Sequence, residues 1–363
     1  MLPAVGISVV RMAGNSDKPT IAITMGDPCG IGPEVVAKTL ASNDIYSICH
    51  PVVIGSGYAM KQAAGLGGIP LKIHEVDSAR DGGQTAGQID IIDPNNLNPE
   101  DITVGHISPT CGRACMEWVS AAGALALSGD VDAIATAPVN KEAASLAGYT
   151  SIGHMELLQE LTGAPDVATM LMTKSLWVVH LTTHRSLRIA CDYVTKDRIL
   201  GKLVLTHDTF QEWGIPSPRI GVAALNPHAS DGGLIGNEEA EEIAPAVEAA
   251  REKGINAIGP VPADSIFHQA IDGAYDVVLA MYHDQGHIPV KVHGFKESIT
   301  ANLGLPFVRT SVDHGTAFDI AGQGIASSVS MFQAVRAAVL LSTGQGLSET
   351  GSVPENTTTS SQA

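Results

Sequence analysis

The sequence predicts an α/β fold in which a mainly parallel sheet is flanked by helices. Three observations lead to this prediction. Short runs of β-branched and apolar residues alternate with helical patterns along most of the 363 residues, as in proteins built from β-α-β units. Hydrophobic residues make up 44% of the chain and charged residues 16%, which is typical of a packed soluble protein. The length exceeds that of one ordinary domain, so we expect two lobes.

The individual elements follow from local patterns. The expected strands are 19–26, 50–57, 131–139, 175–184, 219–228 and 275–283. The expected helices are 32–41, 111–129, 154–163, 237–254 and 327–344. Helix 154–163 should end at Gly163, because glycine is common just beyond helix C-termini. Helix 237–254 has acids near its start and bases near its end, as the helix dipole favours.

Charge and cysteine content limit the classes of partner. The net charge of −17 argues against binding to nucleic acid, which needs a basic face. The five cysteines are scattered, which predicts free thiols in a reducing cytoplasm. No run is long and apolar enough for a membrane span, and the start lacks the features of a signal peptide. We expect residues 1–18 to form a loose extension and residues 346–363 a disordered tail.

Three expected strands end in a histidine, namely His184, His228 and His283. The carboxyl ends of parallel strands face the ligand crevice of an open α/β sheet. Three imidazoles there can bind one divalent cation and leave coordination positions open for a substrate. The alternative is that each is an ordinary polar residue at a strand end, which is how we interpret His287 and His293. From the pattern alone both interpretations stay open.

Two acids lie close in sequence to these histidines. Asp284 follows His283 directly, and Asp264 lies in the segment "GPVPAD". Carboxylates commonly orient metal-bound imidazoles or join them as ligands. We therefore include both acids among the candidate site residues.

Glycine-rich segments give the candidate anion sites. The segment 55–60, "GSGYAM", has Met60 where a dinucleotide fingerprint needs its third glycine, so we interpret it as a tight turn. The segment 24–36 is a glycine-loosened loop before a helix, either a plain turn or an anion site. The segment 309–326 is a long loop with several glycines, and loops of that length in compact proteins are usually functional.

Several long motifs together resemble the 4-hydroxythreonine-4-phosphate dehydrogenase family of vitamin B6 biosynthesis. They include "TMGDPCGIGPE", "TAPVNKEA", "LNPHASDGG", "AMYHDQG" and "LGLPFVRTSVDHGTAFDIAGQG". The resemblance covers residues 19–345 and implies a two-domain α/β/α fold like that of isocitrate and isopropylmalate dehydrogenases. It implies an outer domain of 19–145 plus 305–345. It also implies a central domain, 146–304, with a metal site and a homodimer interface.

The resemblance also implies roles for individual residues. The metal ligands would be His184, His228 and His283, in a cleft shared by two subunits. Zinc is the expected ion, with magnesium, manganese and cobalt as alternatives. The substrate-binding residues would be His154, Met155, Lys291, Thr300 and Arg309. The loop would bind NAD or NADP without a Rossmann fingerprint, through His314, Gly315, Thr316, Ala317 and Asp319.

The implied reaction is the oxidation of a secondary hydroxyl of a small anionic substrate to a β-keto acid, which then loses carbon dioxide. Lys291 and Asp264 are the candidates for proton handling, and Asp284 would support His283. Lys291 and Arg309 suit a phosphate or carboxylate.

Two departures from the family pattern affect the expected substrate. Met155 replaces a threonine and Thr300 replaces an asparagine. "HDQGHIP" is also similar to a branch that acts on phosphorylated threonate or erythronate, and to one that acts on aromatic cis-dihydrodiols. A zinc hydrolase is the alternative from another class of enzyme, because an open zinc site also activates water. A hydrolase, however, has no use for the glycine loop, and a non-catalytic binding protein is disfavoured because all three histidines are present.

Overall fold

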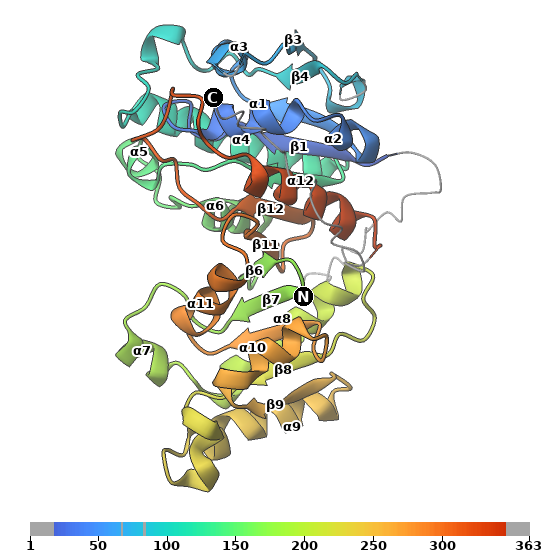
Figure 1. Cartoon of the computed structure of the whole chain (residues 1–363), viewed down its shortest axis with the longest axis vertical. Helices are drawn as coiled ribbons and strands as arrows, with labels where there is room; N and C mark the ends of the chain where they lie inside the picture. Colours follow the sequence, from blue (N-terminus) through green and yellow to red (C-terminus); the bar gives the residue numbers. More distant parts are fainter. Residues whose placement is uncertain (1–17, 67, 83–84, 346–363) are drawn as a thin grey trace, which may run out of the picture.

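A computed structural model describes residues 18–66, 68–82 and 85–345, in which a single sheet is flanked by helices (Figure 1). This arrangement confirms the predicted α/β class. The predicted tail lies outside the described residues, as does the predicted N-terminal extension apart from Lys18. Within the described part of the chain, no helix has both the length and the apolar character needed to cross a bilayer.

The described residues contribute twelve strands to the sheet. They are β1 (Thr20–Thr24), β2 (His50–Ile54), β3 (Lys72–Glu75), β4 (Gln88–Ile92), β5 (Ala133–Thr136), β6 (Ala168–Thr173), β7 (Leu176–His180), β8 (Ile220–Ala223), β9 (Ala257–Val261), β10 (Val277–Ala280), β11 (Ile299–Leu303) and β12 (Val308–Val312). Their order across the sheet is β3-β4-β2-β1-β5-β12-β11-β6-β7-β10-β8-β9.

The middle of the sheet differs from its two ends. The pairings β12–β11, β11–β6 and β6–β7 are antiparallel, whereas the other pairings are parallel. Strands from 19–145 plus 305–345 occupy one half of the order and strands from 146–304 the other half. Figure 1 shows the two halves one above the other, with β12, β11 and β6 between them. The order fits the expected division into domains, although the division itself stays a prediction.

Twelve α-helices occur in the described residues. They are α1 (Gly32–Leu40), α2 (Asn43–Ile48), α3 (Gly57–Leu66), α4 (Pro109–Ser128), α5 (Lys141–Leu146), α6 (His154–Thr162), α7 (Leu187–Asp192), α8 (Lys196–Glu212), α9 (Ala244–Glu252), α10 (Ala263–Ile271), α11 (His283–His293) and α12 (Val329–Ser342). The predicted helix 237–254 begins with a π-helical turn, Glu239–Ile243, before α9.

Helix α4 illustrates how the sequence sets helix ends. The Ser108 side chain accepts a hydrogen bond from the Cys111 amide (3.3 Å), and Pro109 occupies the first turn. Gly129 ends the helix with a φ of 76°, which glycine adopts without steric cost. Inside, Trp118 is fully buried in the main apolar cluster. All five cysteines are free, as predicted.

The histidine-bearing strands are shorter than predicted. Strand β7 ends at His180, β8 at Ala223 and β10 at Ala280. His184 and His228 therefore lie in the connections that follow the strands, not at their last residues. After β8, the amides of Leu225 and Asn226 donate to the Glu239 carboxylate (2.8 and 2.7 Å) instead of to a neighbouring strand.

The segment 283–293 is helix α11 rather than the continuation of a buried strand, and His283 begins it. Gly286 and Pro289 both lower the helix propensity of this segment, so its sequence does not predict a helix. Tertiary contacts support it, because Gln285 accepts from the Met281 amide (2.7 Å) and donates to the Ala224 carbonyl (2.7 Å).

Candidate active site

His184 and His283 lie close together at one edge of the sheet. Strands β7 and β10 are parallel neighbours, with His180 opposite Ala280, so the connections that follow them leave the sheet at the same edge. The ring centroids of His184 and His283 are 5.7 Å apart. Both rings line a cavity of about 340 Å³, which Tyr282 also lines. The structure therefore brings two of the three predicted metal ligands to one cavity.

Two further histidines extend this pair into a row. His283 and His287, one turn apart on α11, stack with ring centroids 3.6 Å apart. Nδ1 of His287 lies 3.1 Å from Nε2 of His180, at the end of β7. Burial, with the neighbouring imidazoles, holds the pKa of His180 well below its usual range. The interpretation of His287 as an ordinary polar residue misses this contact.

His228 lies apart from the other two predicted ligands. It is exposed on a turn, Pro227–Gly233, in which residues 228–232 all have positive φ. In the described ranges, no group of three or more His, Cys, Asp or Glu side chains is arranged so that it could hold a metal ion. The three-histidine metal site therefore remains a prediction. A single chain does not bring all three histidines together.

The donor chemistry of these histidines nevertheless suits a divalent cation. Nδ1 of His283 lies 2.6 Å from Asp284, and Nδ1 of His228 lies 3.2 Å from Asp231. A carboxylate on Nδ1 leaves Nε2 as the metal donor, an arrangement common around metal-bound histidines. Burial, reinforced by the charge of Lys141, lowers the pKa of His184, which keeps its imidazole neutral.

Arg309 is a buried cation to which no carboxylate of the described residues is hydrogen-bonded. Its Nε and Nη2 donate to Oγ1 of Thr136 (3.1 and 2.6 Å), and its Nη1 donates to Oδ1 of Asn302 (2.7 Å). The residue is only 5% exposed. Burial lowers the pKa of Arg309 to about 9, so the guanidinium is still charged at neutral pH. A buried charge held only by neutral acceptors is costly, and an anionic ligand would offset that cost.

His154 and Lys141 connect Arg309 with the histidine pair. Burial, followed by the charge of Arg309, holds the pKa of His154 well below its usual range. Nε2 of His154 has no hydrogen-bond partner within the described part of the chain. The charge of Lys141 acts on both His154 and His184, whereas Glu156 acts in the opposite sense on His184 and Arg309. These side chains therefore share one electrostatic environment. Lys141 lies in the motif "TAPVNKEA", which was the signal that could have identified it.

The two departures from the family pattern lie near Arg309. Met155 receives a contact from Oγ1 of Thr169 (3.3 Å), and Thr169 accepts from Nδ2 of Asn302 (3.5 Å). Thr300 and Asn302 are two residues apart on β11, so they point to the same face of the sheet. Asn302, which sequence reasoning missed, thus places an amide side chain on the same face of β11 as Thr300, where it contacts Thr169 and Arg309.

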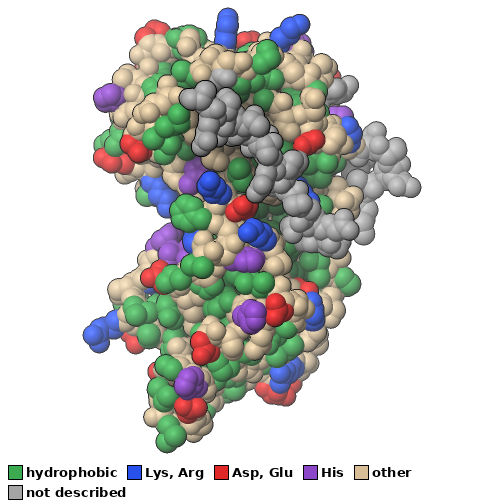
Figure 2. Space-filling model, viewed as in Figure 1, with side chains coloured by type: hydrophobic (Ala, Val, Ile, Leu, Met, Phe, Trp, Pro, Cys, Tyr) green, Lys and Arg blue, Asp and Glu red, His purple; other side chains and the backbone are tan. Residues whose placement is uncertain are grey.

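Lys291 is held by a cluster of oxygens. Its Nζ forms an ion pair with the Asp313 carboxylate, donates to the Asp313 carbonyl (3.1 Å) and donates to Oγ of Ser298 (3.2 Å). Ser298 in turn donates to Asp313 (2.8 Å). Asp264, the other candidate for proton handling, is exposed in the first turn of α10 and bonds to none of these residues. Figure 2 shows histidine, basic and acidic side chains gathered at the waist between the halves.

The glycine loop packs against the loop that follows β1. Residues 309–312 of the predicted loop belong to β12, so the loop begins at Asp313. The Ile31 amide donates to the Thr316 carbonyl (2.9 Å), and a side chain at Gly30 would clash with Thr316. The segment 24–36, a plain turn or an anion site from its sequence, and the long glycine loop therefore pack together as one structure.

The predicted cofactor-binding residues all lie on this loop. His314 is exposed beside the Gly315 carbonyl, and Thr316 is buried. Ala317 has a φ of 41°, and the Asp319 carbonyl accepts from the Gln323 side chain. The structure gathers them near the start of the loop, while their role in binding NAD stays a prediction.

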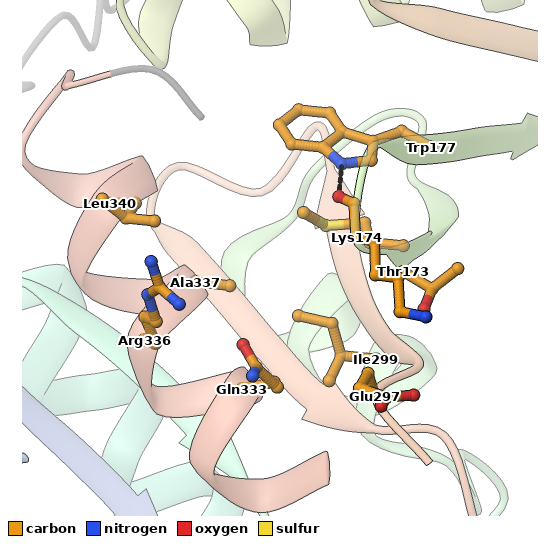
Figure 3. A pocket seen from close by; sticks show the side chains of 10 residues that line it. Thr173, Lys174, Trp177, Glu297, Ile299, Gln333, Arg336, Ala337 and Leu340 are labelled. Atoms are coloured by element: carbon orange, nitrogen blue, oxygen red, sulfur yellow. Dashed lines mark hydrogen bonds between the residues drawn. The ribbon is translucent and has the colours of Figure 1, made fainter. Parts of the chain in front are cut away.

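A different pocket lies between the β6–β7 hairpin and α12 (Figure 3). Lys174, Trp177, Glu297 and Arg336 are among the residues that line it, and Nε1 of Trp177 donates to the Lys174 carbonyl (3.4 Å). The pocket holds only about 30 Å³, and none of the predicted site residues lines it. We therefore do not associate it with the reaction.

Comparison with known proteins identifies the family. The family model described as "Pyridoxal phosphate biosynthetic protein PdxA" matches residues 47–338. The chain belongs to the PdxA family. All the predicted site residues lie within the matched range. The match confirms the resemblance predicted from the motifs.

Individual PdxA relatives are similar over most of the chain. A protein of Halalkalibacterium halodurans named "Putative D-threonate 4-phosphate dehydrogenase" is 45% identical over 321 residues, covering 88% of this chain and 96% of the relative. A crystal structure of 4-hydroxythreonine-4-phosphate dehydrogenase from Klebsiella pneumoniae is 42% identical, with a TM-score of 0.83, and covers 90% of this chain and 100% of that one. A terephthalate 1,2-cis-dihydrodiol dehydrogenase from Burkholderia xenovorans is 31% identical, with a TM-score of 0.63 and coverage of 89% and 98%. These similarities confirm the predicted fold class and the predicted enzyme class, a dehydrogenase.

Proposed function

We propose that the protein catalyses the NAD-dependent oxidation of the C3 hydroxyl of a phosphorylated four-carbon hydroxy acid. The names of its relatives suggest two substrates, 4-phosphohydroxy-L-threonine and 4-phospho-D-threonate. The two differ at C2, which carries an amino group in the first and a hydroxyl in the second. 4-Phosphoerythronate belongs to the same class.

The observation that carries this proposal is the buried guanidinium of Arg309. It has neutral hydrogen-bond partners and lies in the same electrostatic environment as His154 and Lys141. A phosphate or carboxylate accepts well from such a group, because Arg presents several donors in a fixed plane. An uncharged substrate would leave the guanidinium with only its neutral hydrogen-bond partners and the charge of Glu156.

The chain's own residues would bind the substrate and move its proton. Arg309, His154 and Lys141 would hold the anionic group. Lys291, positioned by Asp313 and Ser298, is our candidate for exchanging a proton with the substrate hydroxyl, because Asp264 lies exposed and apart. Asp284 would orient the His283 ring.

Two groups that the chain would bind complete the chemistry. NAD would accept the hydride from C3, and the loop that begins at Asp313 is the segment that we expect to hold it. A divalent ion, with zinc expected, would polarise the substrate oxygens. His184, His283 and His228 are the donors that suit it. Homodimerisation belongs to this proposal, because within one chain His228 does not join the other two histidines.

The product explains why decarboxylation belongs to the proposal. Loss of a proton and a hydride from the C3 alcohol gives a ketone β to the C1 carboxylate. Such an acid can lose carbon dioxide, since the electron pair of the broken bond becomes an enolate. The enolate then takes up a proton, for which Lys291 is again our candidate donor.

A substrate panel tests the proposal. Each of 4-phosphohydroxy-L-threonine, 4-phospho-D-threonate, 4-phospho-D-erythronate and an aromatic cis-dihydrodiol would be incubated with NAD, with and without added zinc, and NADH formation followed by absorbance. Turnover of a phosphorylated acid supports the proposal. Turnover of the dihydrodiol alone would refute it, and so would hydrolysis of the phosphate ester without NADH formation.

A further inference from the structure

Two buried cysteines from distant parts of the chain meet where the loop that follows β1 (residues 25–31) packs on α4. Sγ of Cys29, in this loop, donates to Sγ of Cys111, in the first turn of α4, over 3.4 Å. Both residues are 0% exposed, and both thiols are free. A disulfide bond joins two sulfurs about 2.05 Å apart, so a small movement would allow oxidation to link this pair. None of the reaction steps proposed above uses either thiol.

The surroundings make the two thiols chemically different. Cys111 lies at the start of α4, where the Ser108 hydroxyl accepts from its amide (3.3 Å), and helix N-termini favour thiolates. The hydrogen bond from Cys29 lowers the pKa of Cys111, although burial opposes it. The same hydrogen bond, followed by burial, raises the pKa of Cys29. Cys111 is therefore the thiol that becomes a nucleophile, whereas Cys29 keeps its proton.

A cavity gives a small oxidant access to the neighbourhood of this pair. Its volume is about 470 Å³, and it opens between α1, α3 and the end of the glycine loop. Pro28 and Gly30, the two neighbours of Cys29 in the chain, both line it. A peroxide, which is little larger than water, could therefore come within one residue of the thiols. A bulky oxidant could not follow, because both cysteines are buried.

Forming the bond would move the loop rather than α4. A Cβ at Gly112, beside the cysteine of α4, would lie 2.4 Å from the Ala143 backbone, so close packing on α5 anchors this helix. The loop that carries Cys29 would therefore close most of the gap. Two residues later, the Ile31 amide donates to the Thr316 carbonyl (2.9 Å). The shift would weaken this hydrogen bond, which joins the loop to the glycine loop.

We propose that Cys29 and Cys111 form a redox switch, in which a peroxide converts the two thiols to a disulfide and so loosens the contact between the loop after β1 and the glycine loop. The Cys111 thiolate attacks one peroxide oxygen, the O–O bond breaks, and hydroxide leaves. Cys29 then attacks the sulfur of the resulting sulfenic acid, and water leaves as the S–S bond forms. Two thiols and one hydrogen peroxide thus give one disulfide and two waters, and an external dithiol reverses the change.

Peptide mapping of the full-length chain tests the bond itself. The reduced protein would be treated with hydrogen peroxide, and the remaining thiols would be alkylated in denaturant before digestion and mass spectrometry. We expect a linked pair of peptides that contains Cys29 and Cys111, lighter by two hydrogens, which dithiothreitol separates. Cys49 is equally buried but donates to the Ile45 carbonyl, so it should be recovered alkylated. Recovery of Cys29 and Cys111 without a link between them would refute the proposal.

Variants test the order of attack. Cys29→Ser keeps a hydroxyl that can donate to Cys111 but cannot form the disulfide, so dimedone should label the sulfenic acid at Cys111. In Cys111→Ser, the same treatment should leave Cys29 unlabelled. Cys49→Ser is the matched control and should form the disulfide as the unmodified chain does. Labelling of Cys29 instead of Cys111 would overturn the assigned roles.

Hydrogen–deuterium exchange tests the mechanical consequence without any turnover. Oxidation should speed up exchange of the Ile31 amide several-fold, because its hydrogen bond to Thr316 opens more often. The Trp213 amide, which donates to the Thr209 carbonyl (3.0 Å) at the end of α8, is the remote control and should not change. Unchanged exchange at Ile31 in the linked protein would show that the disulfide is not a switch.

The outcomes are independent of the proposed dehydrogenase function. If that function holds, oxidation should also lower the rate of NADH formation several-fold, and dithiothreitol should restore it. If no substrate of the panel is turned over, the disulfide and the exchange of Ile31 still decide this inference.

Discussion

The guanidinium of Arg309 donates a 2.7 Å hydrogen bond to the side chain of Asn302, across the antiparallel pair of strands β12 and β11. Two neighbouring strands thus fix a buried cation in one orientation. Contacts of this kind, between segments that are distant in the sequence, hold the other candidate site residues in place as well.

Arg309→Lys should impair the use of phosphorylated substrates. Lysine keeps the charge but cannot donate to Thr136, Asn302 and an anion at the same time. We expect kcat/KM to fall by about 10²-fold, which corresponds to about 2–3 kcal/mol. Steady-state kinetics would measure the effect, and the circular dichroism spectrum would check the fold. Unchanged kcat/KM would exclude Arg309 from the anion site.

Asp284→Asn should weaken metal binding. The amide cannot stabilise the His283 imidazole as the carboxylate does, and loss of such a partner typically costs about 10–100-fold in metal affinity. His184→Ala should remove bound zinc altogether. Zinc content and affinity would be measured by mass spectrometry and competition with a chelator. His268→Ala, an exposed histidine paired with Asp272 on α10, is the control, and equal zinc loss in this control would contradict the assignment.

Lys291→Gln and Asp264→Asn separate the two candidates for proton handling. Lys291 is positioned by Asp313 and Ser298, whereas Asp264 is exposed. We expect Lys291→Gln to lower kcat by about 10²–10⁴-fold, the usual contribution of a positioned acid or base. Asp264→Asn should leave kcat within about twofold of the unmodified enzyme, since nothing bonds it to the site. The reverse result would transfer the role to Asp264.

Asp27→Asn should stabilise the protein in a pH-dependent way. Burial raises the pKa of Asp27 to about 6. Its Oδ1 accepts from the Cys29 amide, and its Oδ2 has no hydrogen-bond partner among the residues that the structure describes. In the unfolded chain the carboxyl titrates near pH 4, so above about pH 6 the folded state pays to keep the charge buried. Asparagine removes that cost. We expect the free energy of unfolding to rise by about 1–3 kcal/mol at about pH 8.

The same comparison at low pH is the internal control for Asp27. Near pH 4 the folded state already binds the proton, so the difference between the two proteins should approach zero. Urea denaturation at several pH values would measure it. A difference that does not change with pH would show that the carboxylate is not held as a buried charge.

Gly286→Ala should destabilise the protein, because the new methyl group would meet the His180 ring and Val178. We expect a loss of about 1–3 kcal/mol in the free energy of unfolding. The matched control is Gly201→Ala in the middle of α8, where a methyl group meets nothing within 4 Å. That change should stabilise by about 0.5–1 kcal/mol. Equal effects of the two substitutions would contradict the close packing of α11 on β7.

Much of the fold could be predicted because apolar runs and helix-end signals are local. Helix α4, Pro109–Ser128, lies within two residues of the predicted bounds 111–129 at each end, and β1, β2, β5 and β10 lie within the predicted runs. Helix α11 could not be predicted in this way. Its Gly286 and Pro289 disfavour a helix, and the contacts of Gln285 and His287 that support it come from other segments.

The candidate site likewise contains residues that local sequence motifs identify and residues whose partners lie far away in the sequence. Motifs identified His184, His283, Lys291 and Arg309 by resemblance, and the structure places the first two side by side. Asn302 was missed because its role depends on the pairing of β11 with β12. No local pattern contains such a relationship.

Strand β11 also has a mechanical consequence. It joins the two halves of the sheet by pairing with β12 on one side and β6 on the other. Any hinge motion between the halves must therefore bend the sheet at the strands that carry Asn302 and Arg309. An anion bound to Arg309 would restrain the strands about which the two halves would move. Binding of the substrate would then also make the whole molecule stiffer.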